Sequence, residues 1–256
     1  MSADNISNML KTADVRTVCL ESIDSTSTYA RSLVDSGETS LLLVVADEQT
    51  GGRGRNGKSF YSSNKGSVYM SVVLHPCVPF ADAVGVTTAS AVAVSRAIEK
   101  VTGKSTEIKW VNDLYSGGKK VCGILCEAVG KNGNVSAVII GVGINLADCE
   151  FPDELAGIAD TLGCDASLRD SLIAAVADEL FSLSFGALSE VLLDEYRRKS
   201  LVIGKCIDFY VNGQKNTATA VGIDECGGLI IRKDDGTQDV LRSGEISVRV
   251  SQCAWQ

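Results

Sequence analysis

Residues 51–58 (GGRGRNGK) form a loop with four glycines and three cationic side chains, directly after the apolar run 41–46. Glycines let backbone N–H groups approach an anion closely. The spacing fits the dinucleotide-binding pattern and the P-loop formula, but both require a helix to begin at once after the loop. Here a turn-rich segment and a predicted strand, Val68–Leu74, follow instead. The loop is therefore expected to join two strands and to use its charge differently, the alternative being a solvated turn with incidental cations.

Composition narrows the classes of protein. A chain of 256 residues with 45% apolar side chains is long enough to bury a substantial core. Its net charge of -8 argues against nucleic acid, because such partners bind basic surfaces. No apolar run has the length that spans a bilayer, and residues 1–13 lack the apolar segment of a signal peptide. We expect a cytoplasmic protein that binds neither DNA nor membrane.

Cysteine and histidine usage excludes several kinds of site. The nine cysteines are odd in number, scattered, and without a Cys-x-x-Cys pair, and this favours reduced thiols over disulfides. The single histidine, His75, ends a predicted strand. A Ser-His-Asp triad or a histidine-based zinc site would rest on that one residue, so we expect neither and predict no protein metal site.

Hydrophobic periodicity predicts the elements of a first domain. They are a frayed segment 1–14, a strand 15–22, a capped helix 29–34, a strand 41–46 buried on both faces, a strand 68–74, one long helix 80–102 ended by Gly103, a hairpin of 107–115 with 119–128, a strand 135–143, and helices 167–185 and 187–199. Antiparallel hairpins with helices gathered on one side make an α+β domain.

After residue 200 the sequence changes to short β-rich segments without a helix. Five strands are expected, at 201–211, 217–224, 228–233, 238–243 and 245–250. Such a series predicts a small β-barrel. The chain is therefore divided into an extension (1–14), a main domain (15–200) and a C-terminal domain (201–256).

Four motifs together resemble the biotin protein ligases. They are the cationic loop, KWVND at 109–113, KVCGIL at 120–125 and GVGIN at 141–145, and the resemblance runs from about residue 15 to the C-terminus. It implies a class II synthetase-like biotin/lipoate ligase catalytic domain followed by an SH3-like β-barrel. Two positions depart from the family pattern, because Val111 stands where proline is usual and Ser27 where asparagine is frequent.

The resemblance implies an ATP-dependent biotin–protein ligase. Such an enzyme joins the carboxylate of biotin to the α-phosphate of ATP, with Mg²⁺ accompanying the nucleotide, and then transfers biotin to a lysine in the carrier domain of a carboxylase. Both steps move negative charge, so catalysis depends on positioning and electrostatic stabilisation. Few residues precede the first strand, so the DNA-binding domain of many relatives is not expected, whereas a homodimer remains open.

The resemblance also assigns roles to residues. Lys120 would lie between the biotin carboxylate and the α-phosphate, and Arg53 and Arg55 would close over the ligand because guanidinium groups grip phosphate. The residues matched to catalysis are Lys120 and Arg55. Those matched to biotin are Ser25, Thr26, Ser27, Gln49, Gly52, Arg53, Gly54, Arg55, Lys120 and Gly123. Those matched to ATP are Arg53, Arg55, Lys109, Asn112, Asp113, Lys120, Asn145 and Arg249. Trp110 is expected in the core rather than at the adenine.

Two other functions remain open at this point. Lipoate or octanoate transfer would also join a carboxylate to a carrier lysine, but it gives no reason for the cations of residues 52–58. A non-catalytic nucleotide-binding module would fit the P-loop formula. Biotin-dependent exchange of pyrophosphate into ATP separates the three.

Overall fold

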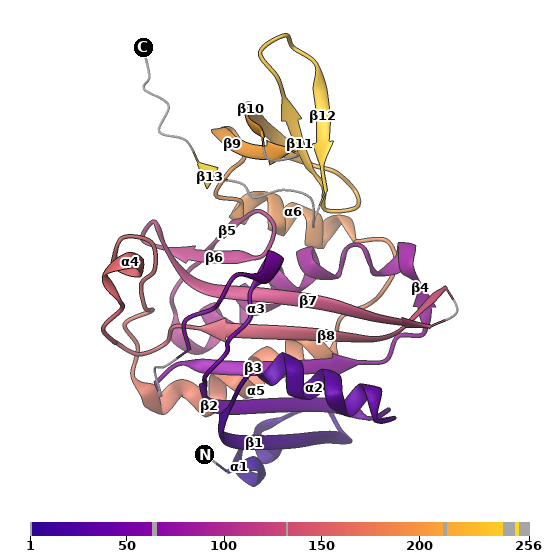
Figure 1. Cartoon of the computed structure of the whole chain (residues 1–256), viewed down its shortest axis with the longest axis vertical. Coiled ribbons are helices and arrows are strands. Elements are labelled where there is room, and N and C mark those ends of the chain that lie inside the picture. Colours follow the sequence, from indigo (N-terminus) through magenta and orange to yellow (C-terminus); the bar gives the residue numbers. More distant parts are fainter. Residues whose placement is uncertain (1, 63–65, 132, 212–213, 243–248, 251–256) are drawn as a thin grey trace.

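The computed structural model describes residues 2–62, 66–131, 133–211, 214–242 and 249–250, with the backbone alone for residues 56, 131, 211, 249 and 250. Its larger sheet has eight strands, seven of them in the order β1-β2-β3-β8-β7-β6-β5, while β4 pairs with β8 (Figure 1). The strands are β1 Val15–Ile23, β2 Leu41–Gln49, β3 Val68–Leu74, β4 Val78–Pro79, β5 Glu107–Lys109, β6 Asp113–Ser116, β7 Lys119–Lys131 and β8 Asn134–Ile144.

Helices cover both faces of this sheet. α2 (Thr26–Asp35) lies on one face, where Ala30 packs in a cluster with Leu42 and Val44 of β2. The other face carries α3 (Val86–Thr102) and α5 (Arg169–Phe181), with Leu43 and Val45 of β2 in the larger core cluster. The prediction of helices on one side is wrong, because β1 and β2 are parallel and α2 is the crossover that joins them.

The N-terminal segment was expected to fray, and that prediction is wrong. Residues Ala3–Met9 form helix α1, whose Ile6 is fully buried in the larger core cluster. Asp178 of α5 accepts hydrogen bonds from the backbone N–H groups of Lys11 and Thr12, each at 3.0 Å. One buried apolar side chain in a largely polar segment gives almost no periodic signal, and the carboxylate that holds the segment lies far along the chain.

Replacing Ile6 with alanine should therefore destabilise the whole protein. We expect the free energy of unfolding to fall by about 2–4 kcal/mol, because the substitution leaves a cavity between α1 and the core. Equilibrium unfolding in urea measures this loss of unfolding free energy. The matched control is Met9→Ala on the same helix, where the side chain is 48% exposed, and a loss of under about 0.5 kcal/mol is expected. Equal losses in both variants would contradict the docking of α1.

Two predicted elements are divided in the structure. The helix expected at 80–102 is a 3₁₀ turn, Phe80–Ala83, followed by α3, which ends at Gly103 with φ +69° as predicted. The strand expected at 107–115 is the antiparallel pair β5–β6, joined by a turn at 110–112 that contains a cis Trp110–Val111 peptide. The turn at Gly117-Gly118, which has positive φ at both residues, connects β6 to β7 as expected.

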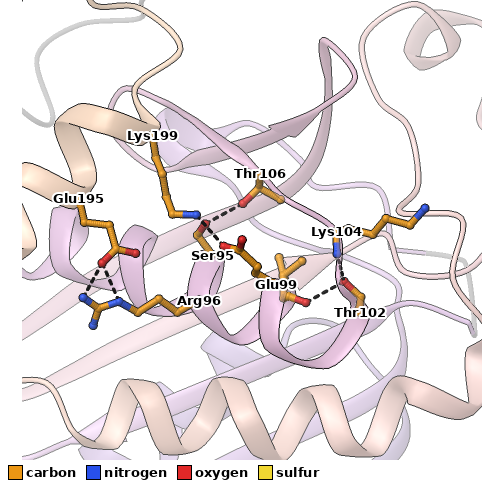
Figure 2. A network of polar contacts seen from close by, with 9 residues as sticks. Ser95, Arg96, Glu99, Thr102, Lys104, Thr106, Glu195 and Lys199 are labelled. Atoms are coloured by element: carbon orange, nitrogen blue, oxygen red, sulfur yellow. Dashed lines mark hydrogen bonds and ion pairs between the residues drawn. The ribbon is translucent and has the colours of Figure 1, made fainter.

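Helix α6 (Glu190–Lys199) lies between the two sheets of the molecule (Figure 1). Two ion pairs fasten it to α3, Arg96 with Glu195 at 2.6 Å and Lys199 with Glu99 at 3.0 Å (Figure 2). Both pairs are partly exposed, so each contributes little stability alone. Together they fix α6 along α3. Helices α3, α5 and α6 are shorter than expected, whereas α2 is longer than the predicted helix 29–34. A further short helix, α4 (Asp153–Ala156), lies in a segment assigned no structure from the sequence.

The second sheet is antiparallel, with strand order β12-β11-β10-β9-β13, and lies beyond α6 (Figure 1). Its strands are β9 Cys206–Val211, β10 Gln214–Ile223, β11 Leu229–Arg232, β12 Gln238–Leu241 and β13 Arg249–Val250. They follow the predicted series, although most of the last expected strand, 245–250, lies outside the described residues. We propose that the boundary between the two domains lies at residue 200, between the end of α6 and the start of β9. Among the described residues, no helix has the length and apolar character to cross a membrane.

Candidate active site

One cavity gathers most of the residues selected from the sequence. It lies under the cationic loop, against β7 and β8, and the N-terminus of α2, the turn 110–112 and the start of β6 also contribute to it. The selected residues that line it are Ser25, Thr26, Ser27, Gln49, Arg53, Gly54, Arg55, Lys109, Asn112, Asp113, Lys120 and Gly123. Segments as distant as residues 25 and 123 thus meet at one place.

Hydroxyl groups at one end of the cavity form a directional chain. The carboxamide oxygen of Gln49 accepts from the Thr26 backbone N–H at 2.8 Å and from the Thr26 hydroxyl at 3.1 Å. The hydroxyl of Ser71 donates to Thr26 Oγ1 at 2.8 Å, and Ser27 Oγ lies 3.0 Å from Ser71 Oγ. Because the single hydrogen of Ser71 is used on Thr26, Ser27 donates to Ser71. Ser27 therefore has acceptor capacity left, and no hydrogen to give.

The orientation of the Gln49 amide is fixed at both ends. A backbone N–H cannot reverse its role, so the oxygen of Gln49 faces Thr26 and the nitrogen faces the other way. That nitrogen donates to Ser62 Oγ at 3.1 Å, and Ser62 in turn donates to the Phe60 carbonyl at 2.8 Å. One amide hydrogen of Gln49 remains for a ligand. The polar end of the cavity thus presents an acceptor at Ser27 and a donor at Gln49.

Gly141 makes room for Ser27. A Cβ at Gly141 would overlap Ser27 Oγ. We expect Gly141→Ala to raise the KM of a ligand bound at Ser27 by about tenfold, because the hydroxyl must move from its place. Steady-state kinetics measures it. The control is Gly157→Ala, where a Cβ meets nothing within 4 Å. An unchanged KM in Gly141→Ala would mean that Ser27 does not contact the ligand.

Phe60 forms part of the cavity wall, and sequence reasoning missed it. Its ring packs on the backbone of two glycines, because a Cβ at Gly143 would overlap the ring and one at Gly123 would lie 3.0 Å from it. The amine of Lys120 lies 5.9 Å from the ring centroid. Phe60 therefore offers Lys120 a cation–π contact. Ser71, also missed, left a signal, since it is a polar residue within a strand that is buried throughout.

The cationic loop is a folded hairpin rather than an open turn. Its backbone is closed by Gly54 N–H to the Lys58 carbonyl at 2.7 Å and by Phe60 N–H to the Gly52 carbonyl at 2.9 Å. Arg53 donates two hydrogen bonds to the carboxylate of Glu127 on β7, at 2.8 and 3.2 Å. This bidentate pair seats the loop on the sheet.

Arg55 points from the loop toward the turn 110–112. Its Nη1 donates to Asn112 Oδ1 at 3.2 Å, and Asn112 donates in turn to the Ile124 carbonyl. Its Nη2 is buried and has no partner among the described residues. Burial lowers the pKa of Arg55, and the charge of Asp113 opposes that change. A buried guanidinium with an unused donor is an incomplete site for an anion.

Lys120 and Lys109 supply further positive charge. Lys120 Nζ forms an ion pair with Asp113 at 2.7 Å, and both side chains are somewhat under one third exposed. Lys109 Nζ lies 3.3 Å from the hydroxyl of Tyr115. Burial, and then the charge of Asp113, raises the pKa of Tyr115 to about 12, so its hydroxyl stays protonated. The cavity thus has a cationic end opposite its hydroxyl end.

Three selected residues do not line the cavity. Gly52 lies behind the wall, where a Cβ would overlap Ser62 Oγ and the Phe60 carbonyl. Asn145 is buried, and its side-chain amide donates to the Asp160 carbonyl at 3.0 Å. In this structure it therefore fixes the backbone beside the cavity and does not line it. The backbone of Arg249 pairs with Asp208 in the second sheet, and its side chain lies outside the described part of the chain. Trp110 is 5% exposed and belongs to the larger core cluster, as predicted, and it also lines the cavity.

Two segments of the chain match known protein families. Residues 19–145 match the Biotin/lipoate A/B protein ligase family, and residues 202–249 match the Biotin protein ligase C terminal domain. The chain belongs to the biotin/lipoate protein ligase family. This confirms the family resemblance and the expected fold class, and the two matched ranges correspond to the two sheets of this ligase-family chain.

Three relatives illustrate the similarity. The bifunctional ligase/repressor BirA of Bacillus subtilis (strain 168) is 42% identical over 142 residues, an alignment that spans 55% of this chain and only 44% of the relative. The biotin–[acetyl-CoA-carboxylase] ligase of Paracoccus denitrificans is 29% identical over 237 residues, spanning 87% of this chain and 96% of the relative. A structure of the biotin protein ligase from Aquifex aeolicus in complex with biotin and ATP superposes with a TM-score of 0.74 at 28% identity, covering 94% of this chain and 100% of that one.

Proposed function

We propose that this chain is an ATP-dependent biotin–protein ligase that acts in the cytoplasm on the carrier domain of a biotin-dependent carboxylase. One observation carries the proposal, namely a single cavity with a hydroxyl and amide end, an apolar middle and a cationic end. Biotin has the same sequence of groups, a polar ureido ring, an aliphatic chain and a carboxylate. The Aquifex aeolicus relative is described in complex with biotin and ATP, which supports the same pair of substrates here.

The hydroxyl end suits a ureido ring. That ring offers N–H donors and one carbonyl acceptor. Ser27 Oγ, whose hydrogen is given to Ser71, accepts an N–H of the ring, and the remaining amide hydrogen of Gln49 is donated to the ring carbonyl. Met70, Ile124 and Val142 line the apolar middle of the cavity against which the aliphatic chain packs.

The cationic end suits the activation step. A carboxylate oxygen of biotin attacks the α-phosphorus of ATP, and the bond from that phosphorus to the bridging oxygen breaks, so that pyrophosphate leaves with the electron pair. The two reacting anions repel one another, and the amine of Lys120 placed between them offsets that repulsion. Lys120 exchanges part of its contact with Asp113 for the ligands. The unused Nη2 of Arg55 donates to a phosphate oxygen.

Transfer to the carrier follows from the same arrangement. The neutral lysine amine of the carrier attacks the carbonyl carbon of biotinyl-5′-AMP and forms the amide bond. The C–O bond to the phosphate breaks, AMP leaves with its electron pair, and the proton from the amine passes to the departing phosphate and from there to solvent. Arg55 and Lys109 stabilise the charge on the leaving phosphate. Until the carrier arrives, the loop held by Arg53 on Glu127 keeps water from the anhydride.

Mg²⁺ would enter with the nucleotide. Among the described residues there is no group of three or more His, Cys, Asp or Glu side chains arranged for a metal. Asp113 lies in the cavity wall. Mg²⁺ in such enzymes binds one or two carboxylates together with substrate phosphates, and Asp113 fits that pattern. When bound, the ion neutralises charge on the phosphates.

Exchange of labelled pyrophosphate into ATP tests the proposed function. We expect exchange that requires biotin and that lipoate does not support. Exchange with lipoate alone would favour lipoate transfer, and none with either acid would favour a non-catalytic nucleotide-binding module. Incubation with the unmodified carrier domain of a carboxylase should then add one biotinyl mass to that domain. The homodimer stays a prediction, to be checked by light scattering.

A further inference from the structure

Ser71 places a hydroxyl group in the middle of the fully buried strand β3. Met70 and Val72 point into the larger core cluster, whereas Val73 packs in the cluster beneath α2. Because side chains alternate along a strand, Ser71 shares the α2 side of the sheet with Val73. Its side chain has no exposed surface. A hydroxyl group in such a place is costly unless it is hydrogen-bonded, so its bonds need to be followed.

The neighbouring strand leaves room beside Ser71 for a second hydroxyl group. Gly141 on β8 is the register partner of Ser71, and register partners project from the same face of a sheet. A Cβ at Gly141 would overlap Ser27 Oγ, so the Ser27 hydroxyl occupies the space of the missing side chain. It lies there 3.0 Å from Ser71 Oγ.

The hydrogen bonds around Ser71 all run in one direction. The direction is set by the backbone N–H of Thr26, which can only donate and therefore fixes the Gln49 oxygen as an acceptor. The Thr26 hydroxyl gives its hydrogen to the same oxygen and accepts from Ser71. Ser71, having given its hydrogen, accepts from Ser27.

Ser71 is thus the residue that transmits the direction of the Gln49 amide to Ser27. A hydroxyl group can donate or accept, and without Ser71 the hydrogen of Ser27 is free to turn into the cavity. With Ser71 in place, Ser27 presents lone pairs there. Ser71 is not among the residues that line the cavity, so any effect on a ligand passes through Ser27.

We propose that Ser71 is a positioning residue that sets the selectivity of the site for the ring of biotin. By keeping Ser27 an acceptor, it makes the site select a ring N–H at this point and reject a ring oxygen. The inference rests on the proposed function, since it places the ureido ring at the hydroxyl end. Two acceptors that face one another lack the hydrogen for a bond, and both remain unpaired.

Equilibrium binding to the full chain tests the proposal, measured by titration calorimetry with three ligands. They are biotin and the two cyclic carbamates in which one or the other ring N–H of biotin is replaced by oxygen. One of the two carbamates places its oxygen at Ser27, and the other places it elsewhere. The test variant, Ser71→Ala, removes the hydroxyl that receives the hydrogen of Ser27.

Ser95 provides a matched control. It is also a serine without exposed surface, and its hydroxyl bonds to that of Thr106 at 2.8 Å (Figure 2). Neither residue lines the cavity. Ser95→Ala should therefore lower Tm about as much as Ser71→Ala does, while the affinity for each of the three ligands stays within about twofold of the wild type.

For the wild type we expect each carbamate to bind at least about 10²-fold more weakly than biotin, because the site is left with an unpaired polar group. In Ser71→Ala the affinity for biotin should fall by about tenfold, since Ser27 loses its fixed orientation. The carbamate with its oxygen at Ser27 should keep its affinity, because Ser27 can now donate to it. Discrimination against this carbamate therefore narrows by about tenfold, and discrimination against the other stays unchanged.

A purely structural role gives a different pattern. Ser71→Ala would then lower Tm and weaken all three ligands by one factor, or by none, and either result would overturn the inference. So would narrowed discrimination against both carbamates, or a wild type that binds them as well as biotin. If the wild type binds no biotin, the proposed function itself has failed, whereas normal binding with unchanged ratios in Ser71→Ala removes only the role of Ser71.

Discussion

Lys120→Ala should reduce the rate of biotin-dependent pyrophosphate exchange by about 10²–10³-fold, the loss typical of removing one group that stabilises transition-state charge. The amine lies between Asp113, at 2.7 Å, and the Phe60 ring, at the point where the loop meets β7. Among the described residues, Asp113 is the carboxylate that pairs with Lys120, so alanine leaves this carboxylate without its cation. The repulsion between Asp113, the biotin carboxylate and the α-phosphate is then no longer offset by an amine at this position, although Arg55 and Lys109 remain in the cavity. The effect should fall on kcat more than on either KM.

The neighbouring Lys119 offers a control for Lys120. It carries the same charge one residue earlier, is 42% exposed and pairs with Asp160 at 3.4 Å, outside the cavity. Lys119→Ala should therefore retain exchange within about twofold, since exposed pairs contribute little. Equal loss in the two variants would point to a general effect of charge. Undiminished exchange in Lys120→Ala would remove that residue from the chemistry.

Arg55→Ala should lower kcat/KM for ATP by about 10²-fold while leaving the stability of the protein nearly unchanged. Nη1 of this guanidinium donates to Asn112 Oδ1, and its buried Nη2 has no partner among the described residues. A buried donor without a hydrogen-bond partner destabilises the folded protein when no nucleotide is bound. A bound phosphate supplies the missing acceptor and so removes that cost. The loss of activity and the change in stability can therefore be measured separately. Kinetics at varied ATP concentration give kcat/KM, and thermal unfolding gives Tm.

The control for Arg55 is Arg31→Ala, which removes an exposed arginine that pairs with Asp35 along α2 at 3.0 Å. Both variants lose one positive charge, so a shared fall in activity would indicate long-range electrostatics rather than contact. A large drop in Tm with normal kcat/KM for ATP in Arg55→Ala would show that Arg55 has a structural role. Arg55→Lys should recover little of the lost activity, because an ammonium cannot reach Asn112 and a phosphate with separate fixed donors.

Elements with strong local patterns were predictable from the sequence. β3 has the bounds Val68–Leu74 that its apolar run indicates, and the ends of α3 at Gly103 and of the β6–β7 hairpin at Gly117-Gly118 follow from glycine conformations. The cationic loop does join two strands, as the absence of a helix signal after it indicates. Eight of the selected residues that line the cavity belong to three short motifs, the cationic loop, KWVND at 109–113 and KVCGIL at 120–125.

Features that depend on distant partners were not predictable. Which face α2 covers depends on the parallel pairing of β1 with β2, and no residue in either strand signals that direction. The pairing of Arg53 with Glu127 joins positions 74 residues apart. Trp110 was expected in a core, but only the fold shows that its partner is a backbone carbonyl, a group that every residue carries. Such contacts have no periodic or compositional signal.

The docking of α1 has a consequence during translation. Lys11 and its partner Asp178 lie 167 residues apart, so the first helix leaves the ribosome long before the surface that receives it exists. At typical synthesis rates of roughly 5–20 residues per second, this interval is on the order of ten to thirty seconds. Throughout that time the side chain of Ile6 is accessible to water and to other nascent chains. We therefore expect residues 3–9 to be a contact point for chaperones that bind growing polypeptides, and to be released only when α5 has folded.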